Sequence, residues 1–303
     1  MVTARPSLRD EIVGGAIVAA SAMAFGTVVV LAKVASNRGM PVGSLLGFRF
    51  GIAALVLAVV VRATGRSLRP PRGEALRLFL MGAVGYAVES GLFFLSLERG
   101  TPGAVSLLFF TYPVWVAGVA ALAGQGLPGP LVAGSLLFAV GGAALVVASS
   151  GGVDITALGI VFALSSSGSF AVYLVAFDVL VRRSTPLVSS LWVSGGTSLA
   201  LSAFAVASGT GELPASPAVW WTVIGMGVLT AGAFLGLFAG LRRIGPVRTS
   251  IVGALEPVAA AGLAFAFLGD AMRPGTLAGG ALIVGAAVAA TLARRPVRAD
   301  PVP

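Results

Sequence analysis

The sequence predicts an all-α integral membrane protein of ten transmembrane helices, and three observations lead to this fold class. The chain has 303 residues, of which 57% are hydrophobic and only 10% are charged. A soluble domain carries about 25% charged residues, so this chain would have too few polar groups to cover its core in water. Ten apolar runs reach the length of about 20 residues that crosses a hydrocarbon core, and arginines gather in alternate joints between them.

Each predicted span is a continuously apolar run bounded by residues that favour turns. The spans lie at 12–36, 41–63, 75–97, 102–123, 129–149, 156–181, 186–208, 218–240, 247–268 and 275–293. Glycine, proline and asparagine mark the joints, as at 37–39, 69–72 and 127–130. A β-barrel is disfavoured, because its strands alternate in polarity over about ten residues. Residues 1–11 are predicted to form a polar leader, and residues 294–303 a tail.

The distribution of arginine predicts the orientation. If every span crosses the membrane, fifteen arginines fall on one side and three on the other, namely Arg38, Arg99 and Arg273. Cytoplasmic loops carry an excess of Lys and Arg, so the leader, the tail and both termini are predicted to be cytoplasmic. The net charge of +9 is explained in the same way, without a nucleic-acid partner.

The second half of the chain echoes the first. Prolines recur at an offset of 144 residues, in the pairs Pro102 and Pro246, Pro113 and Pro257, and Pro130 and Pro274; earlier pairs, such as Phe25 and Phe170, recur at 145. The predicted repeats, 12–149 and 156–293, have five spans each. Because five is odd, the second copy enters from the opposite face. Such an inverted repeat places a transporter's substrate site near the midplane, between the halves.

Several short motifs, in order and in both halves, resemble the EamA-type transporters of the drug/metabolite transporter superfamily. They are Ala24-Phe25-Gly26, Phe48-Arg49-Phe50, Tyr86 with Phe93-Phe94, Thr111-Tyr112-Pro113-Val114 and Leu255-Glu256-Pro257-Val258. The resemblance covers nearly the whole chain. It implies ten helices in two EamA repeats and movement of amino acids, other metabolites or drugs across the inner membrane, often outward. One departure is Gln125-Gly126, where many members carry Gly-Glu.

Four charged residues inside predicted spans are candidates for substrate binding or coupling: Lys33, Arg49, Glu89 and Glu256. A charge at mid-helix costs at least about 2.5–3.5 kcal/mol, so such residues are functional candidates by default. We expect the first three to cluster in the outer half of the first repeat. The alternatives are a static ion pair between Arg49 and Glu89 that orients helices, and a Lys33 that snorkels to the interface.

Pro113 and Pro257 are candidate helix breaks or hinges, since proline cannot donate to the helical ladder. In the middle of the ninth span, Pro257 is expected to free the carbonyl of Gly253 beside Glu256. Burial favours the neutral form of a carboxyl group, so Glu256 is a candidate proton carrier. The alternative is a neutral, hydrogen-bonded acid that seals a helix contact. Tyr112 occupies the matching place in the first repeat.

Aromatic side chains supply the candidates for lining a cavity: Phe25, Tyr86, Phe94, Tyr112, Trp115, Tyr173 and Trp192. For each of them, plain packing or contact with lipid is the competing interpretation. Asp178 corresponds to Lys33 in the repeat and lies four residues before Arg182. We interpret Asp178 and Arg182 as a surface pair at i,i+4 spacing.

The chain has no Cys and no His, which excludes disulfides, thiolate chemistry, His-ligated metals and Ser–His catalysis. No metal, cofactor or enzymatic activity is expected. We predict a secondary transporter of small metabolites, with amino acids or related compounds and export favoured. It would use alternating access through a central midplane cavity, with or without protons, as a monomer in a bacterial inner membrane. The alternatives are a transporter of drugs or other metabolites, a channel, and a membrane-embedded enzyme.

Overall fold

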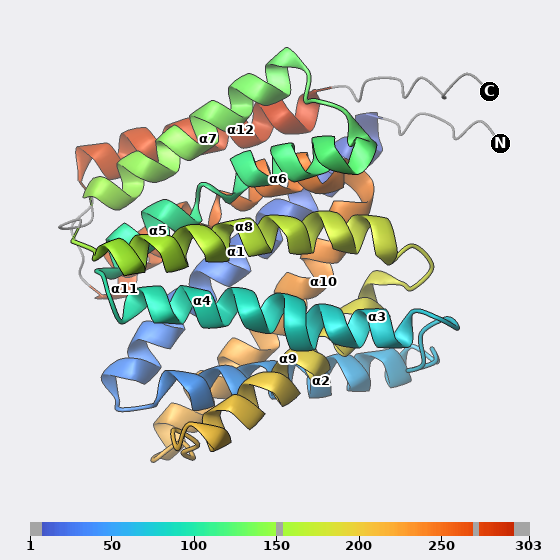
Figure 1. The fold of residues 1–303 in the computed structure, drawn as a ribbon, viewed down its shortest axis with the longest axis vertical. Coiled ribbons are helices and arrows are strands. Elements are labelled where there is room, and N and C mark those ends of the chain that lie inside the picture. The colour runs from blue at the N-terminus through green and yellow to red at the C-terminus, as the bar shows by residue number, and fades with distance from the viewer. Residues whose placement is uncertain (1–7, 150–153, 269–272, 294–303) are drawn as a thin grey trace.

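The computed structural model describes residues 8–149, 154–268 and 273–293 (Figure 1). This part of the chain is helical and contains no β-strand; its β-type pairing is an isolated bridge between Gly100 and Ile155. The predicted tail and the first seven residues of the predicted leader lie outside the described residues. The all-α fold class is thereby confirmed for the residues described.

The first repeat contains the five predicted spans, two of which consist of several helical segments. The first, second and fifth spans are α1 (Leu8–Asn37), α2 (Val42–Ala63) and α7 (Pro130–Ser149). The third span consists of α3 (Ala75–Leu80), the π-helix η1 (Met81–Tyr86) and α4 (Ala87–Leu97). The fourth consists of α5 (Pro102–Phe109), α6 (Tyr112–Ala120) and the π-helix η2 (Ala121–Gln125).

The second repeat is formed by α8 (Ala157–Leu180), α9 (Pro186–Ala207), α10 (Pro217–Gly253), α11 (Glu256–Leu268) and α12 (Pro274–Leu292). Nine helical stretches among the described residues are long and apolar enough to cross a membrane, and Glu256–Phe267 is a shorter apolar helix. These elements confirm the architecture of two five-span repeats.

The joint between the predicted eighth and ninth spans lies at a kink inside α10. Gly245 has a non-helical φ of 78° and ψ of 171°, so the residues of α10 from Pro246 to Gly253 form a separate helical segment that begins the ninth span. The ninth span is therefore split between the last turns of α10 and the whole of α11. Pro257, a predicted helix break or hinge, lies in the first turn of α11, directly after the interruption at residues 254–255. There its missing N–H breaks no helical hydrogen bond, because the first turn has no intrahelical acceptors.

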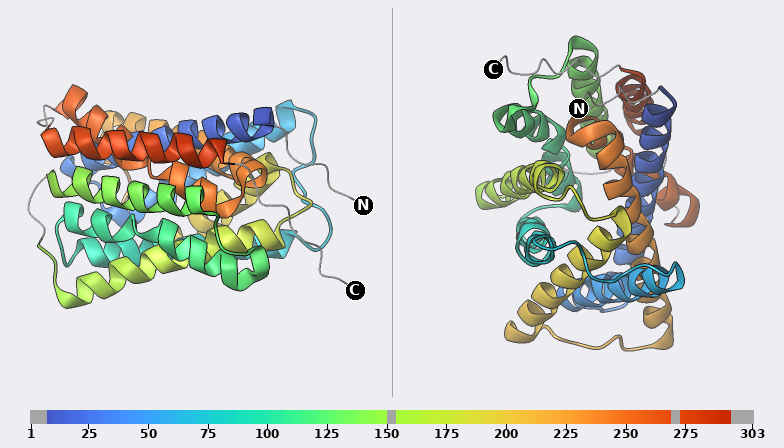
Figure 2. Two further views of the ribbon diagram at one scale, coloured as in Figure 1. Left: turned by 90° about the horizontal axis from the view of Figure 1, so that it is seen from above. Right: turned by 90° about the vertical axis from the view of Figure 1, so that its right-hand side faces the viewer.

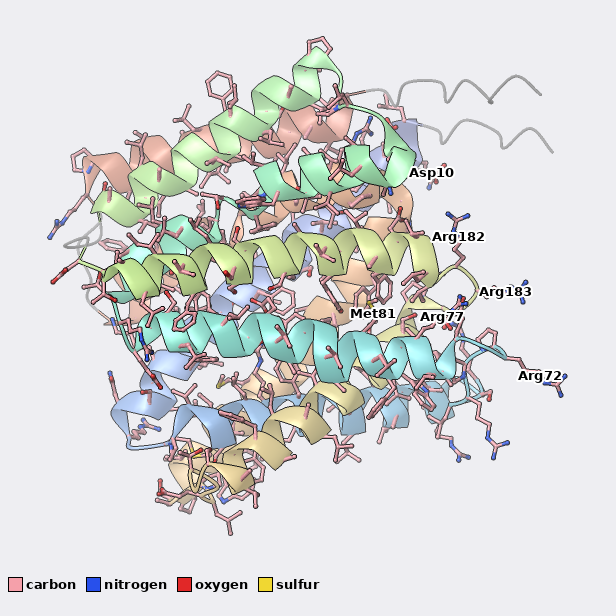
Figure 3. All side chains as sticks on the ribbon, viewed as in Figure 1. Asp10, Arg72, Arg77, Met81, Arg182 and Arg183 are labelled. Atoms are coloured by element: carbon pink, nitrogen blue, oxygen red, sulfur yellow. The ribbon has the colours of Figure 1, made fainter. Side chains whose placement is uncertain are left out.

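Figures 1 and 2 show that α1 begins and α12 ends at the same end of the bundle. Arg72, Arg77, Arg182 and Arg183 lie at this end, which we call the arginine-rich end (Figure 3). Its assignment to the cytoplasm stays a prediction. Asp10 and Glu11 also lie there, in the first turn of α1, where acidic side chains favour the positive end of the helix dipole.

The two repeats pack on one another through equivalent helices. Helix α2 lies against α9 and helix α7 against α12, so in both pairs a helix meets its own counterpart. Helices α1 and α10 form a further extensive contact, as do α4 and α8. Small residues allow close approach: a Cβ added at Gly142 would lie 2.6 Å from the carbonyl oxygen of Gly279. The repeats therefore share one interior.

Candidate functional site

The interior holds a cation at the contact between the repeats. Arg49 projects from α2, and its Nε donates a hydrogen bond of 2.8 Å to Oγ1 of Thr230 on α10. Its guanidinium carbon lies 4.6 Å from the centroid of the Phe50 ring. The guanidinium is also within hydrogen-bonding reach of the Tyr86 hydroxyl. A side chain of the first repeat is thus held by a hydroxyl of the second.

Two acidic residues, Glu89 and Glu256, interact electrostatically with Arg49. Glu89 on α4 is only 5% exposed, and it accepts a hydrogen bond of 3.1 Å from the Ser90 hydroxyl. The Ser166 hydroxyl of α8 donates to the backbone carbonyl of Glu89 at 3.0 Å and lies 3.4 Å from its Oε1. Arg49 interacts electrostatically with both Glu89 and Glu256. The structure therefore brings together three of the four predicted charged residues, one of them from the opposite repeat.

Glu256 owes its position to a break in the helix. The ninth span is interrupted at Ala254 and Leu255, and the fourth span is interrupted at the equivalent Phe110 and Thr111. The second segment of each broken span begins at Glu256 or at Tyr112, followed in both cases by proline. Broken helices of this kind place backbone ends inside a membrane protein only where they are buried or line a site.

The two breaks contact each other. The Tyr112 hydroxyl donates a hydrogen bond of 3.2 Å to the carbonyl of Ser250, in the last turns of α10. A Cβ added at Gly253 would lie 2.5 Å from the same hydroxyl, so only glycine fits there without a shift. This contact joins the start of α6 to the end of α10, next to the two interruptions.

Aromatic rings enclose the charged group. The Tyr86 ring lies 5.4 Å from Phe50, 5.6 Å from Tyr173 and 5.1 Å from Phe234, measured between centroids. Phe25 reaches the same cluster through Phe234, at 5.7 Å. The Tyr173 hydroxyl is buried and has no hydrogen-bond partner among the described residues. This hydroxyl is a polar group that a bound molecule could satisfy.

A π-helix directs Tyr86 to this position. Tyr86 is the last residue of η1, and π-bulges are frequent at functional sites. At Gly82 an added Cβ would lie 2.1 Å from the carbonyl oxygen of Val193, so η1 approaches α9 at backbone distance. The Thr197 hydroxyl of α9 donates to the Gly82 carbonyl at 3.1 Å. The widened turn is thereby fixed against the second repeat.

Sequence reasoning missed Phe50, Phe170 and Phe234 of this cluster. Phe170 lies 5.0 Å from Tyr112 and 6.5 Å from Tyr86, between centroids. Its correspondence with Phe25 in the repeat was the available signal, since equivalent positions of an inverted repeat tend to face a common centre. Phe234 has no aromatic counterpart, and no pattern in the sequence singles it out.

Other predicted residues lie apart from this group. Lys33 is exposed on α1, which agrees with a snorkelling side chain, and Trp115 is 47% exposed. The Trp192 ring nitrogen donates a hydrogen bond of 2.8 Å to the Leu68 carbonyl, beside the loop at the arginine-rich end. Phe94 packs on Phe93, with ring centroids 5.9 Å apart. The structure therefore does not bring all the predicted residues to one site.

The charge balance indicates what this site can do. Two carboxyl groups and one guanidinium leave one negative charge unmatched when both acids are ionised. A buried charge is costly unless it is paired, so either a proton or a cationic group of a substrate neutralises this excess. No cluster of three or more metal-ligating His, Cys, Asp or Glu side chains occurs among the described residues.

Comparisons with known proteins agree with this architecture. Two stretches of the chain, residues 13–148 and 157–292, match the model of the EamA-like transporter family. No curated protein matches significantly. A solved crystal structure superposes with a TM-score of 0.76, covering 95% of this chain and 99% of its own, at 20% identity, and shows the fold. Because the family model matches both halves, the chain belongs to the EamA-like transporter family and, through it, to the drug/metabolite transporter superfamily.

Proposed function

We propose that this multi-pass membrane transporter moves small metabolites, with amino acids or related compounds as its substrate class and export as its direction. The observation that carries the proposal is the buried group formed by Arg49, Glu89 and Glu256. A free amino acid bears one carboxylate and one ammonium group. The guanidinium of Arg49 has parallel N–H donors that suit a carboxylate, and the carboxylates of Glu89 and Glu256 offer oxygens that suit an ammonium group.

The proposed mechanism is alternating access around this group. Two repeats of opposite orientation with equivalent broken spans are the arrangement in which one half rocks against the other around a midplane site. The contact between Tyr112 and the Ser250 carbonyl lies where those halves meet. The Tyr173 hydroxyl supplies a further polar group for the substrate. In this mechanism the breaks at residues 110–111 and 254–255 act as hinges.

A set of hydrogen bonds, which we call the lock, joins the two repeats at the arginine-rich end. The Glu74 carboxylate, at the start of α3, accepts from the backbone N–H groups of Arg182, Arg183 and Ser184, at 3.0, 2.8 and 2.7 Å, and from the Ser184 hydroxyl. Burial alone would raise the pKa of Glu74, but these hydrogen bonds, led by that of the Ser184 hydroxyl, together hold the pKa below its usual value. The lock joins a loop of the first repeat to a loop of the second.

Glu256 is the proposed proton carrier. It begins α11 and lies close enough to Arg49 for a direct electrostatic interaction. Protonation of one acid would remove the excess negative charge of the empty site, and an incoming ammonium group would replace that proton. Exchange of a proton for a substrate cation therefore follows from the charge balance. We further propose that the protein acts as a monomer in a bacterial inner membrane.

A second candidate is transport of drugs or aromatic metabolites. The rings of Phe25, Phe50, Tyr86, Phe170, Tyr173 and Phe234 around the charged group favour it. Apolar and aromatic walls with few polar groups are the usual composition of small-molecule sites. The amino-acid proposal is preferred because an aromatic compound without a charge would leave the excess carboxylate unmatched.

Counterflow in proteoliposomes tests the proposal. Vesicles holding the purified protein are loaded with unlabelled amino acids, and uptake of a radiolabelled mixture is followed. Saturable exchange by the wild type is expected. Glu256→Gln should keep exchange but lose flux driven by a pH gradient, whereas Glu98→Gln, which changes an acid paired with Arg99 at the surface, should alter neither. Uptake of no amino acid by the wild type would refute the substrate class.

A further inference from the structure

A polar pocket lies outside the central group, at the arginine-rich end. It occupies about 180 Å³ between α8 and α10 and is lined by Phe177, Asp178, Val181, Arg182, Leu241 and Arg242. Drug-sized ligands occupy pockets of about 300–1,000 Å³. A cavity of this volume is therefore suited to a compound of the size of an amino acid.

One cation of the pocket has unused hydrogen-bonding capacity. Nη2 of Arg242 donates to the Val181 carbonyl at 3.3 Å, but its buried Nε has no hydrogen-bond partner among the described residues. A buried donor left without a partner costs about 1–3 kcal/mol. An anionic oxygen bound in the pocket would remove that cost. Arg182 is exposed at the rim and lies at the surface of the bundle (Figure 3).

The pocket also contains an acid, Asp178, which accepts a hydrogen bond from a side chain of the first repeat. Nε2 of Gln125, at the end of η2, donates a hydrogen bond of 3.2 Å to Oδ2 of Asp178. The resemblance leads one to expect a Gly-Glu pair here. By that pattern position 125 would be a glycine, which has no side chain to contact Asp178, whereas the amide of Gln125 supplies a donor. Asp178 and Arg182, which we interpreted as a surface pair, both line this cavity.

We propose that this pocket binds the zwitterionic head of an amino acid as it enters or leaves at the arginine-rich end. Arg242 and Arg182 bind the carboxylate, Asp178 binds the ammonium group, and Phe177, Val181 and Leu241 contact the apolar side chain. The proposal rests on the substrate class proposed above, and it adds a second site to the same path.

Aromatic rings connect this pocket to the central group. Phe177 stacks on Phe238 with ring centroids 4.0 Å apart and planes 4° from parallel, and both side chains are fully buried. The Tyr173 ring follows at 6.3 Å from Phe177, and the Tyr86 ring at 5.6 Å from Tyr173. A series of ring contacts therefore runs from the pocket lining to Tyr86. In the proposed path a substrate passes along these rings between the pocket and Arg49.

The experiment measures half-saturating concentrations from each side of the membrane. The probe is the best-exchanged amino acid of the radiolabelled mixture. The chain has no cysteine of its own, so a Thr64→Cys background marks the arginine-rich end. Labelling with a membrane-impermeant thiol reagent then reports the orientation of the protein. Thr64 is exposed at the end of α2, away from the pocket lining.

Arg242→Gln and Asp178→Asn should each raise the half-saturating concentration about tenfold at the arginine-rich end, as expected for loss of one charge-assisted hydrogen bond. At the opposite end the value should change less than about twofold, because the central group is intact. Arg243→Gln is the matched control, since Arg243 is the next residue of α10 and does not line the pocket. If Arg242→Gln fails to fold, Asp178→Asn still tests the pocket independently.

The outcomes separate this proposal from the preceding one. If the wild type exchanges amino acids but both variants keep the wild-type values on both sides, the pocket assignment alone is wrong. Equal changes on the two sides would assign a general structural role instead and overturn it too. If the half-saturating concentration changed only in vesicles containing phosphatidylglycerol, the two arginines would bind lipid phosphate rather than the substrate, and the proposal would be wrong. If the wild type exchanges no amino acid, both proposals are wrong.

Discussion

The two broken spans share a backbone design but differ in their chemistry. Both are interrupted two residues before a proline, and both second segments begin at that interruption. In the first repeat the residue before the proline is Tyr112, a neutral hydrogen-bond donor; in the second it is Glu256, an acid beside Arg49. The backbone symmetry suits two alternating states, while the side chains confine the acid to one half. Function can therefore be asymmetric although the scaffold is not.

The largest expected effect comes from removing the shared cation. Arg49→Met removes the cation that interacts electrostatically with Glu89 and Glu256, together with its hydrogen bond to Thr230, and should destabilise the protein by about 1–3 kcal/mol. Exchange should fall at least about a hundredfold, since one substrate contact and the local charge balance are lost together. Counterflow and thermal unfolding in detergent measure the two effects. Near wild-type exchange would show that transport does not need the charged group around Arg49. The chemical difference between Tyr112 and Glu256 would then have no functional meaning.

The contact between the two breaks should show strong coupling. Gly253→Ala places a methyl group against the Tyr112 hydroxyl and should destabilise the protein by about 1–3 kcal/mol. Tyr112→Phe removes that oxygen, at a cost of about 1 kcal/mol for its hydrogen bond to Ser250. The double variant should be about as stable as Tyr112→Phe alone. Thermal unfolding of the four proteins gives the coupling, and additive effects would show that the breaks act independently.

The lock at the arginine-rich end should depend on pH. Glu74→Gln should destabilise the protein at neutral pH by about 1–3 kcal/mol, because a charged acceptor of several hydrogen bonds is replaced. The folded pKa of Glu74 is lowered from its ordinary value of 4.5, so its stabilisation is fully present above that value. It is lost as the pH falls through the lower folded pKa. The difference between the two proteins should therefore be constant near neutrality and shrink in acid.

That experiment compares melting temperatures of wild type and Glu74→Gln across a pH series. A difference that grew on acidification would contradict the assigned protonation state of Glu74. Glu98→Gln provides the control, because Glu98 lies at a surface and its side chain is 68% exposed. A surface pair of that kind contributes about 0–1 kcal/mol.

The smallest effect is expected at Lys33, the repeat counterpart of Asp178. Lys33 is exposed on α1, whereas Asp178 lines the pocket between α8 and α10. Lys33→Gln should change the half-saturating concentration of exchange by less than about twofold, as is usual for an exposed side chain. A larger change would show that equivalent positions in both repeats contact the substrate. Side-resolved uptake distinguishes the two cases.

The sequence was sufficient for the architecture but not for the details of the centre. Span length, arginine distribution and the proline offsets predicted the helices and the repeat, because membrane thickness and turn chemistry act locally. A helix break or hinge at Pro257 was predicted, but not whether the helix would kink there or end and restart. A proline is compatible both with a kinked helix and with the first turn of a new one, and the distant contact of Tyr112 with Ser250 distinguishes them.

Exposure was equally hard to predict. Trp115 and Lys33 lie on helices that are apolar on all sides, so the sequence carries no periodic signal for which face turns inward. The grouping of Arg49, Glu89 and Glu256 was only half foreseen. A cluster within the first repeat was expected, and the acid of the second repeat joins it because the two breaks meet.

The seams between the repeats have a consequence for the origin of the molecule. Helix α2 packs on α9 and α7 on α12, each against its own counterpart, which is the contact pattern of a homodimer with a two-fold axis. The chain is in effect an antiparallel dimer of five-span subunits tied into one polypeptide. Once the subunits were tied together, a substitution in one copy no longer appeared in the other. An acid could then arise at position 256 while a tyrosine remained at 112.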